Sequence, residues 1–160
     1  MGDINGDGGL DTLIGSRDTD IIELNGGAGW LFYSTPTSIA AADLTLTPDG
    51  ANDRLGEELS YAGDINDDGF DDLLIGARFD DAGSTDAGTL YLLYGPLGSG
   101  SMVGADATFT GDSSSDNGGC SAGGVDVDGD GGLDLVMGLR GNDDAASGAG
   151  AVLLFLGGSI

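Results

Sequence analysis

The fold of this chain is decided by the stretch Asp64-Ile65-Asn66-Asp67-Asp68-Gly69-Phe70-Asp71-Asp72, because the same pattern occurs three times. The other two copies are Asp3-Ile4-Asn5-Gly6-Asp7-Gly8-Gly9-Leu10-Asp11 and Asp126-Val127-Asp128-Gly129-Asp130-Gly131-Gly132-Leu133-Asp134, and the three copies are spaced by 61 and 62 residues. A fixed period of this length is the sequence signature of a repeat architecture.

Short strands are expected around each acidic stretch. Each copy leads into an apolar run, and an Ala-Gly pair further on precedes a second run that is rich in aromatic and branched residues. Alternation of this kind over four to six residues predicts strands. The expected strands are residues 13–17, 30–33, 44–47, 59–63, 74–78, 90–94, 107–110, 121–125, 136–140 and 152–156.

These strands predict an all-β chain, with β-propeller blades of four antiparallel strands. Four short strands cannot bury both faces of their own sheet, so neighbouring sheets must stack. We expect a single segment, residues 1–160, divided into repeats at 1–54, 55–116 and 117–160, with about 3 + 4 + 3 strands. Propellers close with about 4 to 8 blades. Two and a half to three repeats therefore predict an incomplete propeller, unless it is extended or completed by self-association through open blade edges.

The charge of the chain excludes several classes of function. The 28 acidic residues stand against 4 Arg, no Lys and no His, for a net charge of −24. Nucleic-acid binding needs clustered basic residues, so no nucleic-acid partner is expected. An anionic membrane surface is disfavoured for the same reason. No apolar run approaches the roughly 18 residues of a membrane span, so membrane insertion is not expected either, and no signal peptide is visible.

The nine-residue acidic loop carries the metal chemistry. Oxygen-bearing side chains at positions 1, 3, 5 and 9 can converge on one cation, and Gly at position 6 permits a sharp turn. Hard oxygen ligands without His or Cys favour calcium over zinc or copper, and a large, flexible shell over the octahedron of magnesium. The alternative is an acidic, solvated turn. An EF-hand is excluded, because its Glu at position 12 is replaced by Ile14, Ile75 and Met137 inside expected strands.

At this point the chain resembles the FG-GAP repeats of the integrin α-subunit β-propeller and its bacterial relatives. The resemblance is best over residues 55–96, where Leu55-Gly56 stands for the Phe-Gly pair and Gly76-Ala77-Arg78 for Gly-Ala-Pro. Arg replaces the family's Pro in all three repeats, and Asn117-Gly118 stands where the third repeat should carry Phe-Gly. The resemblance implies about three calcium sites, one per repeat, with backbone carbonyls at position 7. The implied ligands are Asp3, Asn5, Asp7, Gly9 and Asp11; Asp64, Asn66, Asp68, Phe70 and Asp72; and Asp126, Asp128, Asp130, Gly132 and Asp134. The first site, which lacks a preceding strand, is expected to bind calcium more weakly.

The three repeated arginines and the single cysteine are also expected to have structural roles. Arg17, Arg78 and Arg140 each lie 14 residues after the first ligand of their repeat. We expect them to form inter-blade or loop-anchoring ion pairs with Asp20, with Asp80 or Asp81, and with Asp143 or Asp144; an anion site on one propeller face is the alternative. Cys120 cannot form an internal disulfide and is expected to be a half-buried residue at the start of a strand.

Catalysis is not expected, because the chain has no His, no Lys and one unsupported Cys. The leading interpretation is a calcium-binding, extracellular or cell-surface module for adhesion, protein interaction or self-assembly, since millimolar calcium outside cells suits such sites. Its protein or glycan ligand is open. One alternative is a lectin-like carbohydrate-binding propeller that uses the aromatics Trp30, Tyr33, Tyr91 and Tyr94, although these also fit core positions. Another is an accessory propeller of a polysaccharide-degrading enzyme.

Overall fold

The computed structural model describes residues 2–120 and 124–157. In these residues ten strands and two short 3-10 turns are formed. The elements are β1 (Thr12–Ser16), β2 (Ala28–Phe32), η1 (Ile39–Ala41), β3 (Leu44–Leu46), β4 (Leu55–Gly63), β5 (Asp72–Ala77), β6 (Thr89–Leu93), η2 (Met102–Gly104), β7 (Ala107–Thr110), β8 (Gly124–Val125), β9 (Asp134–Leu139) and β10 (Ala151–Phe155).

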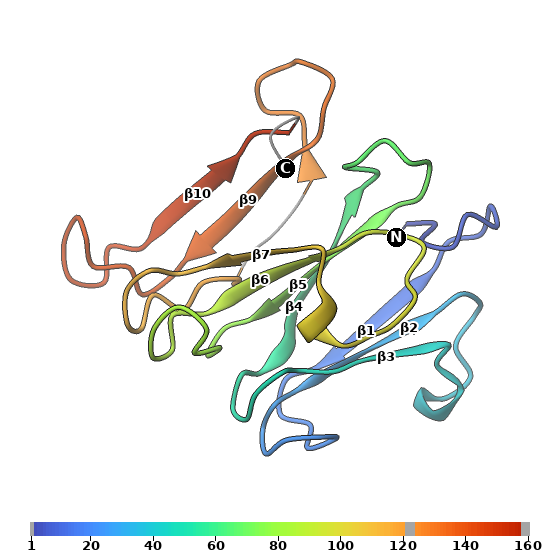
Figure 1. Cartoon of the computed structure of the whole chain (residues 1–160), viewed down its shortest axis with the longest axis horizontal. Helices are drawn as coiled ribbons and strands as arrows, with labels where there is room; N and C mark the ends of the chain where they lie inside the picture. The colour runs from blue at the N-terminus through green and yellow to red at the C-terminus, as the bar shows by residue number, and fades with distance from the viewer. Residues whose placement is uncertain (1, 121–123, 158–160) are drawn as a thin grey trace.

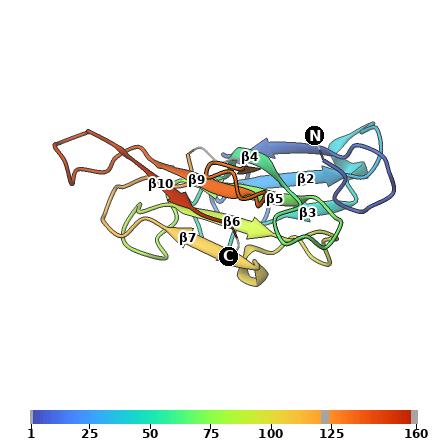
Figure 2. The same ribbon diagram turned by 90° about the horizontal axis from the view of Figure 1, so that it is seen from above.

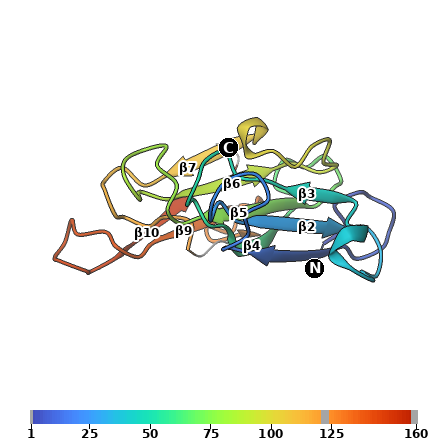
Figure 3. The ribbon, with the colours of Figure 1, turned by 90° about the horizontal axis from the view of Figure 1, so that it is seen from below.

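The strands form three antiparallel sheets, ordered β1-β2-β3, β4-β5-β6-β7 and β10-β9-β8. This confirms the expected 3 + 4 + 3 strands. Residues 124 and 125 of the strand expected at 121–125 form β8, and residues 121–123 lie outside the described residues. Residues 1 and 158–160 also lie outside them. The three sheets follow one another without closing a ring within the described chain, which is the arrangement of an incomplete propeller (Figure 1). Seen from above and from below, the body is flat and elongated (Figures 2 and 3).

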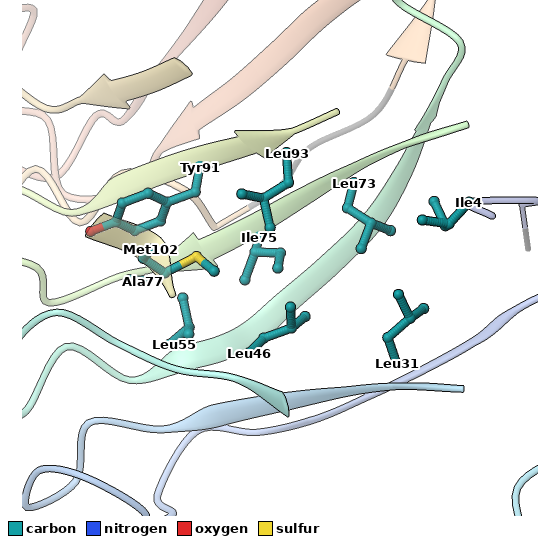
Figure 4. Packing of buried hydrophobic residues seen from close by; sticks show 10 residues of the cluster. All are labelled: Ile4, Leu31, Leu46, Leu55, Leu73, Ile75, Ala77, Tyr91, Leu93 and Met102. Carbon is teal, nitrogen blue, oxygen red and sulfur yellow. The ribbon is translucent and has the colours of Figure 1, made fainter. Parts of the chain in front are cut away.

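The two inner strands of the middle sheet, β5 and β6, are buried on both faces, because their side chains point alternately toward the two neighbouring sheets. Leu73 and Ile75 of β5 face the first sheet, and Leu74 between them faces the last. Adjacent residues of a strand point to opposite faces, so an unbroken apolar run serves both cores. One core comprises Ile4, Leu31, Leu46, Leu55, Leu73, Ile75, Ala77, Tyr91, Leu93 and Met102, shown in Figure 4, and the other Ala62, Leu74, Leu90, Leu92, Leu135, Met137 and Leu139.

Glycines let the sheets approach closely at both junctions. A Cβ on Gly15 would lie 2.3 Å from the carbonyl oxygen of Gly56, and a Cβ on Gly76 would lie 2.0 Å from that of Gly119. Gly56 and Gly119 share a positive φ, +82° and +76°. The structural counterpart of Leu55-Gly56 is therefore Gly118-Gly119. The assignment of Asn117-Gly118 to that place was wrong by one residue, because Gly118 precedes Asp126 by eight residues whereas Leu55 precedes Asp64 by nine.

The outer face of the last sheet is apolar and uncovered. Val152 and Leu154 of β10 are 71% and 46% exposed. Their counterparts in the middle sheet are Leu90 and Leu92, because Val152 pairs with Gly138 as Leu90 pairs with Gly76. Both of these leucines are fully buried against the last sheet.

In the described part of the chain, no helix has the length and apolar character to cross a membrane.

Candidate metal centres

The three acidic loops lie side by side. The first precedes β1, the second joins β4 to β5, and the third joins β8 to β9. The backbone N–H of Asp3 donates to a carboxylate oxygen of Asp71 at 2.8 Å, and the N–H of Asp71 donates to the carbonyl of Asp3 at 3.1 Å. A cavity of about 320 Å³ separates the second and third loops and is lined by Asp64, Ile65, Asn66, Asp67, Asp130, Gly131, Gly132 and Leu133. One edge of the molecule therefore carries all three candidate centres.

The backbone of each loop turns sharply at two positions. Position 6 has a positive φ of +83° at Gly8, +93° at Gly69 and +94° at Gly131, as its glycine predicts. Position 4 is also left-handed, at Gly6, Asp67 and Gly129. Asp is among the few residues other than Gly that tolerate this conformation, which explains how Asp67 replaces Gly in the second loop.

Side-chain oxygens at positions 1, 3 and 5 hold the loop in this shape by accepting backbone N–H groups. In the second loop, the two oxygens of Asp64 accept from Asp68 at 2.9 Å and from Gly69 at 2.8 Å. The side-chain oxygen of Asn66 accepts from Asp68 at 3.1 Å, and Asp68 accepts from Phe70 at 3.0 Å. The first loop repeats all four hydrogen bonds. The third keeps the pattern, with Gly129 N–H taking the place of one donor to Asp126.

The third loop differs in charge. In the first two loops, the amide of Asn5 or Asn66 donates to the position 5 carboxylate, at 2.9 and 3.0 Å. Asp128 takes the place of Asn in the third loop and cannot donate when ionised. Asp126, Asp128 and Asp130 thus face one another with one oxygen of each within 4.8 Å of the others, and all three are exposed.

The position 9 carboxylates are fully buried and close the loop onto the sheet. Asp11, Asp72 and Asp134 each accept the N–H of position 2, at 2.6, 2.8 and 2.7 Å. The second oxygen of Asp72 accepts from Gly95 at 2.9 Å, and that of Asp134 from Gly157 at 2.6 Å. The counterpart of these two glycines in the first repeat is Ser34, and Oδ1 of Asp11 has no partner among the described residues.

These environments shift the pKa values of the buried carboxyls in different directions. Burial raises the pKa of Asp11, and the charges of Asp3 and Asp7 add to this, against hydrogen bonds from the backbone that lower it. Burial also raises the pKa of Asp72. The N–H groups of Gly157 and Val127 lower the pKa of Asp134. Among the three position 9 carboxyls, hydrogen bonds to the charged form thus prevail only in the third loop.

The residues present fit calcium. The donors are carboxylate and amide oxygens, which are the ligands that calcium takes in proteins. The third loop gathers three carboxylates, and the first leaves a buried carboxylate oxygen of Asp11 without a partner. At position 7, the N–H of Gly9, Phe70 or Gly132 donates to the position 5 carboxylate. The structure thus brings positions 1, 3 and 5 together around the turn, and sets position 9 at its base.

The arginines do not pair with the predicted aspartates. Arg17 pairs with Glu57 at 3.0 Å and with Asp18 at 3.4 Å, and Arg78 pairs with the same Glu57 at 3.5 Å. Asp20, Asp80 and Asp81 are not their partners, and among the described residues Arg140 forms no ion pair with Asp143 or Asp144. The prediction failed because Glu57 stands at the blade junction, 40 residues from Arg17. Arg78 also stacks on Phe79, at 4.2 Å from the ring centroid.

The aromatic residues and Cys120 have structural roles. Tyr91 is buried in the first core, Tyr33 packs against that core, and Tyr94 packs against the second. Only Trp30 of the four lies outside both clusters, where it pairs with Ile14 and Thr45 across the first sheet. Cys120 is half-buried as predicted, its thiol donates to the carbonyl of Asn117 at 2.7 Å, and burial raises its pKa. A raised pKa makes a thiol less reactive.

The comparisons with known proteins agree with this geometry. The FG-GAP repeat model matches residues 60–93, which run from the end of β4 through the second loop to the end of β6. The chain is also similar to integrin alpha pat-2 of Caenorhabditis briggsae, with 31% identity over 120 residues that make up 72% of this chain. It spans only 10% of the length of that relative.

Proposed function

We propose that this chain, which carries FG-GAP repeats similar to those of integrin α subunits, is a non-catalytic, calcium-binding propeller module. We propose further that it acts outside cells, in adhesion, protein interaction or self-assembly. The observation that carries the proposal is the repeated loop, in which oxygens at positions 1, 3 and 5 are held around one turn by the same hydrogen bonds. Three such loops lie on one edge of the molecule.

The ligands that we assign are the side chains at positions 1, 3, 5 and 9 of each loop and the carbonyl at position 7. Bound calcium would supply the positive charge that these carboxylates lack within the chain. Asp3, Asp64 and Asp126 hold the turn by accepting two N–H groups each, which limits the rearrangement that binding requires. Asp11, Asp72 and Asp134 stand at or just before the start of the following strand and hold each loop by accepting the N–H of its position 2.

The non-catalytic role is supported by the family and by the residues. The chain has no His and no Lys, and its one thiol has a raised pKa. Carboxylates are the remaining candidates for acid-base chemistry, and most of them accept hydrogen bonds from backbone N–H groups. An extracellular location is supported by the similarity to an integrin α subunit. The packed positions of Tyr33, Tyr91 and Tyr94 disfavour a lectin platform of exposed aromatics.

The partner that we propose for the apolar outer face of the last sheet is a further blade of the same kind. Val152 and Leu154 occupy the places of Leu90 and Leu92, which are buried against the neighbouring blade. A second copy of this chain can provide such a blade, so self-association is the expected behaviour in solution.

Counting bound calcium ions tests the proposal. Equilibrium dialysis would compare the wild-type chain with Asp7→Ala, Asp68→Ala and Asp130→Ala, which remove one exposed position 5 carboxylate from each loop. Each variant is expected to bind one ion fewer. The matched control is Asp67→Gly, which removes a charge from the second loop and gives position 4 the residue found in the other two loops. Unchanged calcium binding in all three alanine variants would refute the proposal.

A further inference from the structure

A second acidic cluster lies outside the nine-residue loops, between the first and middle sheets. It consists of Asp49 and Asp53, in the segment that joins β3 to β4, and Asp80, which follows β5. One oxygen of each residue lies within 4.8 Å of the others. Because β5 begins at Asp72 in the second loop and spans about 20 Å, this cluster is at the opposite end of the strand from the candidate centres above.

Asp53 is buried and its carboxylate faces a cavity. The residue is 4% exposed, and its carboxylate lines a cavity of about 260 Å³ together with Asp49, Gly50, Ala51, Asp80, Asp81 and Ala82. Within the described chain, no hydrogen bond of ordinary geometry reaches either of its oxygens. The Gly50 amide lies near enough to lower the pKa of Asp53, but burial first, and then the charges of Asp80 and Asp49, raise it to about 7.

The other two carboxylates share a single hydroxyl proton. Tyr91 donates to Asp80, and its oxygen also lies 3.1 Å from Asp49. Asp80 further accepts the N–H of Ala82 at 2.7 Å and the hydroxyl of Thr89 at 2.8 Å. A tyrosine hydroxyl has one proton, so it cannot satisfy both carboxylates. The side-chain donors around the cluster are thus gathered on Asp80, and Asp53 has only the backbone N–H of Gly50 beside it among the described residues.

The nearby arginines are directed elsewhere. Arg54 follows Asp53 directly, yet it pairs with Asp18 at 3.5 Å and stacks on Phe79. Arg78 stacks on the same ring and pairs with Glu57. No ion pair within the described residues includes Asp49, Asp53 or Asp80. The cluster therefore has three carboxylates and no cation from its own chain.

At the equivalent junction between the middle and last sheets, a side-chain amide donates to the buried carboxylate. Asp116 corresponds to Asp53, because its carbonyl accepts the N–H of Gly141 as that of Asp53 accepts the N–H of Phe79. Asn142 corresponds to Asp80, because its carbonyl accepts from Gly150 as that of Asp80 accepts from Gly88. Asn142 donates its side-chain amide to Asp116 at 3.3 Å. The carboxylate of Asp116 therefore has an amide donor from the same chain. At the first junction, the place of that amide is taken by a third carboxylate, Asp80.

We propose that Asp49, Asp53 and Asp80 form an additional calcium site at the junction of the first and middle sheets. The oxygens lie close enough together to share one ion at the 2.3–2.6 Å distances that calcium takes, and the cavity has room for the water molecules that complete a shell of 6 to 8 oxygens. An all-oxygen donor set excludes a soft metal. The site joins two blades, so its ion would hold the β3–β4 segment against the loop after β5.

The test is a count of bound calcium ions in the full chain by equilibrium dialysis. Asp53→Asn and Asp80→Asn are each expected to bind one ion fewer than the wild type. Asp116→Asn, at the equivalent junction, is the matched control and should bind as many ions as the wild type. Asp80→Asn is expected to fold, because it reproduces the arrangement of Asn142 and Asp116. The count also separates this site from the loops: if only the loop sites fail, Asp53→Asn still loses an ion.

A second measurement uses Tyr91 as an antenna. Terbium, a luminescent substitute for calcium, emits when a nearby tyrosine is excited, and the hydroxyl of Tyr91 contacts two of the proposed ligands. Tyr91→Phe should lower the terbium emission of the wild type and have no effect on the emission of Asp80→Asn. If Asp53→Asn and Asp80→Asn bind as many calcium ions as the wild type, the proposal is wrong. If, with that unchanged count, Asp80→Asn is also more thermally stable than the wild type in chelator, Asp53 and Asp80 share a proton and do not bind calcium.

Discussion

The side-chain amide of Asn66 donates a hydrogen bond of 3.0 Å to the carboxylate of Asp68 inside the second loop. Asn5 and Asp7 repeat this contact in the first loop, at 2.9 Å. The third loop has Asp128 at the same place, so its three carboxylates face one another without a donor between them. The loops therefore differ in how strongly they need a cation to keep their shape.

Asp128→Asn should convert the third loop to the arrangement of the other two. In chelator, we expect the variant to melt about 1–3 °C above the wild type, because one of three like charges is replaced by an amide donor. With saturating calcium the difference should shrink or reverse, because calcium offsets the same repulsion. Thermal unfolding followed by circular dichroism in both conditions checks this. A lower melting temperature in chelator would contradict the account of the third loop.

Gly76→Ala should disrupt the junction between the middle and last sheets. The new Cβ would meet the carbonyl oxygen of Gly119 at 2.0 Å, a contact that only movement of the backbone can relieve. Overpacking of this kind typically costs about 1–3 kcal/mol of unfolding free energy. Urea denaturation measures the loss, and Gly98→Ala is the control, because a Cβ there meets no atom within 4 Å. Equal stability of the two variants would show that the sheets do not pack as described.

Glu57→Gln should destabilise the chain through the arginines that converge on this residue. Arg78 is 8% exposed and would lose its charged partner, at a cost of about 1–3 kcal/mol of unfolding free energy. Asp18→Asn removes an exposed partner of Arg17 and should change stability by less than about 0.5 kcal/mol. Chemical denaturation of both variants distinguishes the two sites. A Glu57→Gln chain as stable as Asp18→Asn would mean that the shared ion pair contributes little.

Leu154→Asp should weaken self-association. The substitution places a charge in the centre of the uncovered apolar face of the last sheet, where a partner blade would bury it without a counter-ion. Sedimentation velocity in millimolar calcium should show a lower average mass than for the wild type. Val103→Asp is the control, since Val103 is 80% exposed in η2, away from this sheet. An identical mass for wild type and Leu154→Asp would remove this face as the interface.

The strands could be predicted because their signal is local and repeated. Alternation places Leu73 and Leu74 on opposite faces, and the same pattern at a constant spacing identifies the sheets that they join. The turn at position 6 was equally predictable from its glycine. The left-handed Asp67 at position 4 was not, since Asp is common in turns of many kinds.

The contacts between blades could not be predicted, because they join residues far apart in the chain. Asp80 was expected to pair with Arg78, two residues away, but it lies against Asp53 and Tyr91 instead. Glu57 was not singled out at all, although it pairs with two arginines. Comparison of the repeats could have pointed to the cluster, because Asp80 corresponds to Asn142. Both positions are buried, and the carboxylate adds a negative charge at one of them.

Calcium binding by the three loops can be tested through the melting temperature of the 160-residue chain, followed by circular dichroism in about 1 mM calcium and in excess chelator. Three loops with dissociation constants near 0.1 mM would together contribute about 4 kcal/mol at that concentration. We therefore expect a melting temperature about 10 °C higher with calcium, with a β-rich spectrum. The same melting temperature in calcium and in chelator would contradict the assignment of these loops as calcium sites.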